Sequence, residues 1–244
     1  MSAEIIELLK NDDEYYGGVG RQYLSNSDVG SLLTNPKEFG VQRSDSSVFA
    51  VGRLFHQLFL EPEKAAAVKH VDASTRATKI YKDFLAEQTK EIVLLTKEVY
   101  MVKKWVDAMS MNLDFFDIIN EDGVTYEQPA IGEIGGQMWK CKADIITNTH
   151  LYDLKTTGDI EKFKYNFFKY NYDSQAYIYS TLLGKPMVFL VIDKKTLMMG
   201  KYTVSASTLE GGAAKVSRAI DVYQKFFGDN PTTDIGQFYF DQEI

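Results

Sequence analysis

Three strand-like segments follow one another in the middle of the chain and restrict the folds that it can adopt. They read VTYEQPAIG, GGQMWKCKADII and LYDLKTT, between residues 124 and 157. Gly135-Gly136 and Asn148-Thr149 supply turn residues between them, which predicts an antiparallel meander. An apolar segment at 187–192 and its neighbour at 200–204 are expected to extend this sheet.

Helical patterns surround these strands. Residues 47–60 space their apolar side chains as one face of a helix does. Further helices are predicted over 76–88, 96–111, 172–183 and 207–227 from their spacing and end signals. The predicted fold class is α/β, with a mixed central β-sheet flanked by helices and an N-terminal helical region. We expect a single domain over 1–244, divided into a loosely tied arm (1–24), a helical region (25–120), the sheet with its helices (121–227) and a tail (228–244).

Composition excludes several classes of protein. One cysteine, Cys141, permits neither an intrachain disulfide nor a cysteine-rich metal cluster. The sequence has no apolar run near the roughly 20 residues of a membrane span, and the N-terminus does not resemble a secretory signal. We therefore expect a cytoplasmic protein. The net charge is −7, yet residues 137–170 hold six lysines against four acidic residues, so positive charge gathers in the middle of the chain.

The central hairpin carries charges that a buried strand does not need. Asp153 and Lys155 point to the same side of their strand, because side chains alternate with period two. A hairpin that folds near Asn148 brings Asp144 close to Asp153, and two such carboxylates repel unless a cation lies between them. Mg²⁺ prefers this type of ligand, and a nearby lysine suits phosphodiester hydrolysis. The alternative is that Asp153 and Lys155 form an exposed ion pair.

Several further motifs occur in a fixed order. SNSDVGSLLTNPKEF comes first, then GRLFH and LFLEPEK, Glu127, Asp144, DLKTT and QAYIY. Together these motifs, over roughly residues 23–185, resemble the RecE-like phage and prophage exonucleases of the PD-(D/E)xK nuclease superfamily. The resemblance implies a nuclease domain with a mixed sheet flanked by helices. Ala143 departs from the proline of the superfamily name, but proline is not a ligand.

The resemblance also implies a set of metal ligands. Asp144 and Asp153 match the metal-binding carboxylates, and His56 and Glu127 complete the set. His56 lies on one helical face with Gly52, which is expected to let the helix approach the sheet closely. The alternatives are a half-buried structural histidine and an outward-facing strand glutamate. Glu133 is a lower-ranked replacement for Glu127.

The same resemblance assigns catalytic and DNA-binding side chains. Lys155 matches the motif lysine, and Gln175 and Tyr179, at i and i+4, match the QxxxY pair beside the site. Packing alone is an alternative for Tyr179. Thr156 and Thr157 either contact a phosphate or cap the following turn. Lys162 and Lys164 belong to a basic and aromatic stretch that suits DNA, although a solvated lysine face is the simpler reading.

The function that the resemblance implies is a metal-dependent exodeoxyribonuclease. It would hydrolyse linear double-stranded DNA from the 5′ to the 3′ direction and leave 3′ single strands for recombination. Mg²⁺, with Mn²⁺ as substitute and two ions per site, is the expected cofactor. Double-stranded DNA ends, a single-strand annealing protein and a homo-oligomeric ring are the expected partners. A structure-specific endonuclease of the superfamily and an inactive DNA-binding or scaffold protein remain as alternatives.

Overall fold

A five-stranded mixed sheet forms the centre of the protein. The structure is a computed structural model and describes residues 2–41, 45–88 and 92–241. The strand order is β3-β4-β5-β6-β7; β5 and β6 pair in parallel and the other neighbours pair antiparallel. The predicted meander and its two added strands are confirmed. The strands are β3 (Thr125–Ile134), β4 (Gln137–Ile146), β5 (Leu151–Thr157), β6 (Met187–Asp193) and β7 (Met199–Thr203).

Two sequence signals explain how these strands form. Gly135 and Gly136 have φ angles of +59° and +74°. A tight two-residue hairpin turn needs such angles, and side chains with a Cβ disfavour them. Strand β6 is buried along its whole length, because helices cover both of its faces, and its sequence is accordingly a nearly unbroken apolar run.

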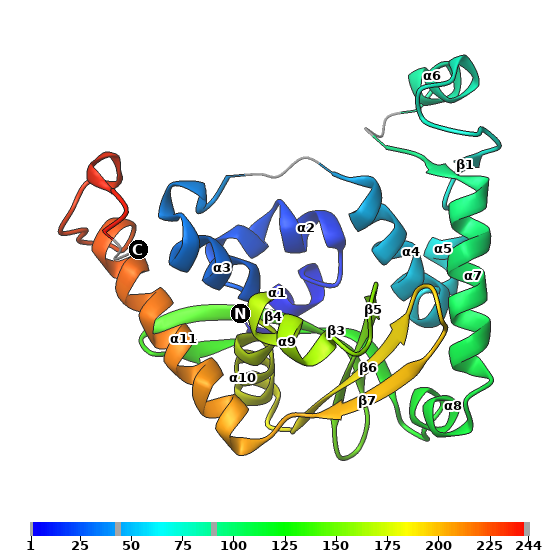
Figure 1. Ribbon diagram of the computed structural model, residues 1–244. Coiled ribbons are helices and arrows are strands. Elements are labelled where there is room, and N and C mark those ends of the chain that lie inside the picture. The colour runs from blue at the N-terminus through cyan, green and yellow to red at the C-terminus, as the bar shows by residue number, and fades with distance from the viewer. Residues whose placement is uncertain (1, 42–44, 89–91, 242–244) are drawn as a thin grey trace.

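Helices pack around the sheet in three groups (Figure 1). The first group lies at one end, the second at the other, and the third connects β5 to β6. Within the described residues, no helix is both long and apolar enough to cross a membrane. The first group is α4 (Ser47–Leu60), α5 (Pro62–Ala66), α7 (Thr96–Ser110) and α8 (Leu113–Ile119); the second is α3 (Asn26–Thr34) and α11 (Ala206–Phe226); the third is α9 (Phe163–Lys169) and α10 (Tyr172–Leu183).

Three apolar cores hold these helices to the sheet, and in one of them Phe163 and Phe167 of α9 pack with Phe189 of β6. In the first, Phe55 of α4 and Trp105 of α7 pack with Leu154 and Leu190 of β5 and β6. In the second, Trp139 of β4 packs against α3, α10 and α11. The predicted fold class is confirmed by this mixed sheet with its flanking helices, whereas the division of the chain into four segments stays a prediction. The smaller elements are η2 (Pro36–Glu38), β1 (His70–Val71), α6 (Lys79–Ala86), β2 (Leu94–Leu95) and η3 (Ile235–Gln237).

The N-terminal segment is not the loosely tied arm that the sequence predicts. It forms α1 (Ser2–Leu8), α2 (Asp12–Tyr16) and η1 (Val19–Gln22). The side chains of Leu9 and Tyr15 are buried, and Leu24 exchanges backbone hydrogen bonds with residues of β4. The segment therefore closes one side of the sheet. Helices of five to seven residues are too short for their apolar spacing to predict this packing from the sequence.

Candidate active site

Strands β4 and β5 part from each other where the two central carboxylates lie. Their ladder is formed by the pairs Ile145–Tyr152 and Ile146–Leu151. At the next position, Oδ2 of Asp144 accepts a hydrogen bond from the backbone N–H of Leu154 at 2.7 Å. Asp144 and Asp153 are 7% and 2% exposed, so the hairpin brings two almost fully buried carboxylates to the place where the strands diverge.

Helix α4 places the imidazole of His56 beside Asp144. Ser46 caps the helix through a hydrogen bond to the N–H of Phe49, and the buried Leu54 and Phe55 fix its rotation. Nδ1 of His56 lies 3.1 Å from Oδ2 of Asp144. The expected role of Gly52 is not supported, because a Cβ added there would meet no atom within 4 Å.

Glu127 reaches the same cluster from strand β3 with an unusual backbone. Its φ angle is +49°, which is rare for a residue other than glycine. Tyr126 pairs with Ile145 and Gln128 with Ala143, so Glu127 lies opposite Asp144 in the register. Ligand atoms of Glu127, His56 and Asp144 all lie within 4.8 Å of one another. Backbone strain of this type is typical of functional sites.

The charges of the cluster act strongly on one another. Burial, and then the charge of Asp144, raise the pKa of Glu127 to about 8 and that of Asp153 to about 6. Burial tends to raise the pKa of Asp144 as well. The attraction of His56 and Lys155 outweighs this effect, so the pKa of Asp144 is lowered. The pKa of His56 is raised, because Asp144 outweighs the opposite effect of burial. Burial and the charge of Asp144 therefore both oppose the ionised forms of Glu127 and Asp153.

Lys155 stands beside the carboxylates on strand β5. Its ammonium forms an ion pair with Oδ2 of Asp153, two residues earlier on the same side of the strand. The ammonium also lies 5.1 Å from the ring centroid of Tyr172 and 6.0 Å from that of Phe189. Burial acts to lower the pKa of Lys155, but the attraction of Asp153 prevails and raises it. The side chains of Lys155 and Asp153 are 19% and 2% exposed, so this pair is not the exposed surface ion pair given as the alternative.

Helix α10 contributes the remaining polar contact. The side-chain amide of Gln175 donates a hydrogen bond to Oδ1 of Asp153. Tyr172, which faces Lys155, lies three residues earlier on the same helix. One turn of α10 therefore touches both members of the DxK pair.

A polar network fixes the start of α10 in place. Nζ of Lys215 on α11 donates to Oδ1 of Asp173 at 2.9 Å, to Oδ1 of Asn171 at 3.2 Å and to the carbonyl of Phe168 at 2.7 Å. Asn171 has a φ of +58°, and its carbonyl accepts a hydrogen bond from Asn26 of α3. A Cβ on Gly212 would come within 2.2 Å of the carbonyl oxygen of Asp173, so α11 packs directly onto this turn.

A second group of cations lies next to the cluster. Lys142 on β4 and Lys64 on α5 each contact Asp12 of α2 at 2.8 Å. The Nζ atoms of Lys140 and Lys142 lie 4.4 and 4.6 Å from the ring centroid of Tyr15. Burial lowers the pKa of Lys140 to about 8. Helix α2 therefore covers two buried lysines that lead along β4 toward Asp144.

The other predicted residues lie outside the immediate cluster. Tyr179 packs in two apolar groups with residues of β4, β6 and α11. The hydroxyl of Thr157 contacts the backbone of Asp159 in the following turn, while Thr156 is partly buried on β5. Lys162 and Lys164 are exposed on the segment after β5. Glu133 is exposed at the far end of β3 and does not belong to the cluster.

Three contacts were not anticipated from the sequence. Tyr172 precedes Gln175 by three residues, so helical spacing could have placed it on the same face. The Lys215–Asp173 and Lys142–Asp12 contacts join residues 42 and 130 positions apart. A local sequence pattern cannot predict contacts between residues that lie so far apart in the chain.

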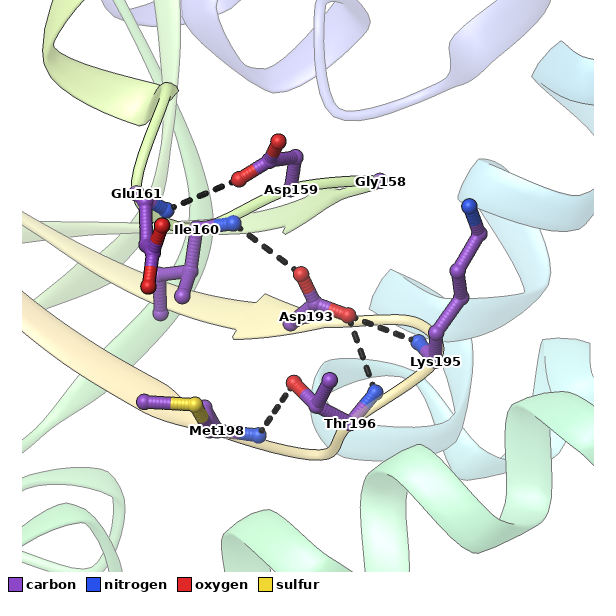
Figure 2. A pocket seen from close by; sticks show the side chains of 8 residues that line it. All are labelled: Gly158, Asp159, Ile160, Glu161, Asp193, Lys195, Thr196 and Met198. Atoms are coloured by element: carbon purple, nitrogen blue, oxygen red, sulfur yellow. Dashed lines mark hydrogen bonds between the residues drawn. The ribbon is translucent and has the colours of Figure 1, made fainter.

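A small cavity lies beside the C-terminal end of β5. Gly158, Asp159, Ile160 and the β6–β7 turn line it (Figure 2). Asp193 at the end of β6 accepts hydrogen bonds from the N–H groups of Lys195, Thr196 and Ile160, at 2.8, 3.0 and 3.0 Å. Asp193 thereby fastens the loop between β5 and α9 to the β6–β7 turn.

The donor set of the cluster fits a divalent metal ion. Carboxylate oxygens suit Mg²⁺ and Mn²⁺, and an imidazole is an accepted ligand for transition metals. Oδ2 of Asp153 is buried without a hydrogen bond, and its contact is the ion pair with Lys155. Two carboxylates with raised pKa values at one place are what an added cation would stabilise in their charged forms.

Comparison with known proteins identifies the class to which this fold and site belong. Residues 33–231 match the family described as PDDEXK-like domain of unknown function (DUF3799). The chain belongs to this family of PDDEXK-like domains. The predicted resemblance to the PD-(D/E)xK superfamily is confirmed.

A solved structure shows the same fold. A crystal structure of a candidate exonuclease from Eubacterium rectale is similar with a TM-score of 0.64 and 14% identity, over 96% of this chain and 95% of that one. The structure of a protein called SSO0001 gives a TM-score of 0.33 and 12% identity, over 80% and 84%. The first likeness shows the fold, whereas the second is too low to show a shared fold. No curated protein matches the chain by sequence.

Proposed function

We propose that the protein is a metal-dependent exodeoxyribonuclease that hydrolyses linear double-stranded DNA. The observation that carries this proposal is the position of Lys155 and Asp153 directly beside the His56–Glu127–Asp144 cluster. The fold is that of PD-(D/E)xK nucleases, and the similar structure from Eubacterium rectale is described as a candidate exonuclease. Directional cleavage from the 5′ end, with release of 3′ single strands for recombination, is part of the same proposal.

His56, Glu127 and Asp144 would hold the metal, and Asp153 would join them. A bound Mg²⁺ or Mn²⁺ supplies a Lewis acid that favours water attack and neutralises charge on the phosphate. We assign two ions to the site, because four ligand side chains exceed what one Mg²⁺ takes from a protein.

The protein's own residues complete the chemistry. The Lys155 ammonium orients the attacking water and stabilises the negative charge that develops on the phosphate. Gln175 holds the Asp153 carboxylate in one orientation through its amide. The aromatic face of Tyr172 limits where the Lys155 ammonium can move. Tyr179, one turn after Gln175, acts through packing that keeps α10 against the sheet.

DNA reaches the site over a basic surface in this proposal. Thr156 and Thr157 lie on the strand that carries the DxK pair, and Lys162 and Lys164 are exposed just after it. Phosphate contacts of this kind position a duplex without reading its sequence. A homo-oligomeric ring, a single-strand annealing partner, a phage origin and a cytoplasmic location remain predictions.

The deciding experiment follows a label on linear duplex DNA. One substrate carries the label at its 5′ ends and a second at its 3′ ends, and a covalently closed circle serves as the control. With Mg²⁺ or Mn²⁺ we expect early release of the 5′ label, late release of the 3′ label, an intact circle, and no reaction in excess chelator.

Each alternative has its own outcome. A circle that is cut as fast as the linear duplex would establish an endonuclease. DNA binding without cleavage at any metal concentration would indicate an inactive binding protein. Full cleavage in excess chelator would eliminate the metal mechanism.

A further inference from the structure

Helix α9 exposes aromatic side chains that its own folding does not require. Phe163 and Phe167, at i and i+4, are 2% and 8% exposed and form its buried face. Tyr165 is 81% exposed, Phe168 52% and Tyr170, just beyond the helix, 54%. The two buried rings already attach the helix to the protein, and each of the outer three residues keeps more than half of its surface open to another molecule.

The buried face of α9 rests on the aromatic group that lies under the catalytic lysine. The ring of Phe163 stacks on that of Tyr172 at 5.9 Å with an interplanar angle of 28°. The ring of Phe167 packs edge-on against Phe189 at 5.1 Å. Lys155 contacts both Tyr172 and Phe189, at 5.1 and 6.0 Å. The exposed rings are therefore one packed layer away from the DxK pair.

Both ends of α9 are held by hydrogen bonds. Before the helix, Asp193 binds the N–H of Ile160 (Figure 2). After it, Lys215 donates to the carbonyl of Phe168 and to the side chain of Asn171. A surface fixed at both ends loses little further freedom when a ligand binds.

Positive charge accompanies the exposed rings. Lys162, Lys164 and Lys169 are all exposed, on a chain whose net charge is −7. Lys162 contacts Asp159 at 3.1 Å, with 72% of its side chain exposed, and such a pair is worth little in water. Nζ of Lys169 lies 6.0 Å from the ring centroid of Tyr170. Lysines and exposed rings therefore share one short surface.

This combination fits single-stranded DNA better than duplex DNA. In a duplex the base faces are stacked on one another and cannot reach a protein ring, whereas an unpaired strand offers every base for stacking. Lysines beside the rings can contact the phosphates of the same strand. A protein partner would have less reason to select lysine, which is depleted at interfaces.

We propose that this surface is a stacking platform for single-stranded DNA next to the active site. It consists of Lys162, Lys164, Tyr165, Phe168, Lys169 and Tyr170, and we call it the α9 platform. This proposal rests on the proposed function in one respect: the single strand that the platform binds is the strand that becomes unpaired at the end of the duplex substrate.

The test measures binding in the absence of turnover. Fluorescence anisotropy, in chelator, follows a labelled 20-nucleotide oligothymidine, an abasic oligomer of the same length, and a blunt hairpin duplex. The variant is Tyr165→Ser/Phe168→Ser. The matched control is Tyr239→Ser/Phe240→Ser, because these two rings are also exposed (74% and 61%) but lie in the C-terminal tail.

We expect the platform variant to bind oligothymidine at least about tenfold more weakly. Its duplex affinity should change less than about twofold, and the wild type should prefer oligothymidine to the abasic oligomer. The tail variant should behave as the wild type. Circular dichroism and thermal unfolding check that both variants are folded.

Three results would overturn the platform. The first is unchanged oligothymidine binding in a folded platform variant. The second is an equal loss in the tail variant. The third is a platform variant whose molecular mass, measured by light scattering, differs from that of the wild type while its DNA binding does not. That result would mean that α9 is a contact between protein chains. Because these measurements need no catalysis, a wild type that binds oligothymidine through α9 but never cleaves DNA would refute the proposed function and leave the platform standing.

Discussion

The side-chain amide of Gln175 donates a hydrogen bond to Oδ1 of Asp153 and so joins helix α10 to strand β5. The other carboxylate oxygen of Asp153 faces the ammonium of Lys155. Asp153 is 2% exposed and has both of its oxygens engaged from opposite sides. Its orientation is therefore set by the protein before any substrate arrives, which is the preorganisation that phosphoryl chemistry requires.

Asp153→Asn should abolish cleavage and leave DNA binding intact or tighter. The amide keeps an oxygen for Gln175 but loses the charge that a metal needs, and a negative charge facing phosphate disappears. We expect a loss of at least about 10³-fold in single-turnover rate. Gel-shift affinity on the same preparation serves as the control. Near-normal turnover would mean that the catalytic site lies elsewhere.

Glu127→Gln should make the metal-free protein more stable at high pH. Burial and Asp144 raise the pKa of Glu127 to about 8 from an ordinary value of 4.5. Between these values the unfolded chain holds fewer protons than the folded one, so Glu127 makes stability fall as pH rises. Glutamine removes this penalty. Urea unfolding in chelator should show a gain of about 4 kcal/mol at pH 8 and almost none at pH 4.

The same variant should bind metal more weakly. Mg²⁺ titration at pH 8 should stabilise the wild type more than Glu127→Gln, because a carboxylate ligand is missing. A variant that gains no stability at pH 8, or that binds Mg²⁺ as the wild type does, would remove Glu127 from the site.

Local sequence patterns predicted the elements near the site well. Helix α4 has the predicted bounds, 47–60, because its apolar spacing and the Glu61-Pro62 end signal agree. The DxK strand and the hairpin that brings Asp144 to Asp153 follow from alternation and turn residues alone. The exact start of a helix is less predictable, since Ser205 caps α11 and the helix begins at Ala206, one residue before the predicted start at 207.

Other features could not be read from local patterns. Glu127 has a left-handed backbone at its position opposite Asp144, and nothing in VTYEQPAIG predicts it. Asp12 meets Lys142 across 130 residues, so the role of the N-terminal segment depends on the assembled sheet. Long-range ion pairs and strained residues are products of tertiary packing, whereas periodicity reports only which face of one element is buried.

Lys215→Met should slow cleavage without weakening metal binding. The change removes the contacts to Asp173, Asn171 and Phe168 that fix the first turn of α10. A small shift of Gln175 and Tyr172 would misplace Asp153 and Lys155, and we expect a single-turnover rate about tenfold lower. Stability should fall by about 3 kcal/mol, because Asp173 is left buried and unpaired.

A second variant separates positioning from folding. Lys215→Met/Asp173→Asn removes the unpaired charge and should recover most of the stability but little of the rate. If rate and stability recover together, Lys215 only holds the fold.

Lys155→Ala should lower the catalytic rate by about 10²–10³-fold in a protein that remains folded. The ammonium is proposed to act on the attacking water and on the charge that develops at the phosphate. Its removal should therefore lower the turnover rate and not the affinity for metal. Metal binding should persist, since Asp144 and Asp153 remain and lose a neighbouring positive charge. Single-turnover cleavage and Mg²⁺ titration on one preparation measure the two effects separately.

A surface lysine provides the control for this change. Lys10 pairs with Glu7 at 2.6 Å and both side chains are widely exposed, so Lys10→Ala removes one ion pair away from the cluster. It should cost at most about 1 kcal/mol of stability and leave the rate unchanged. If Lys155→Ala behaves in the same way, with a normal single-turnover rate, the DxK strand is a structural ion pair and the chemistry must be assigned to other residues.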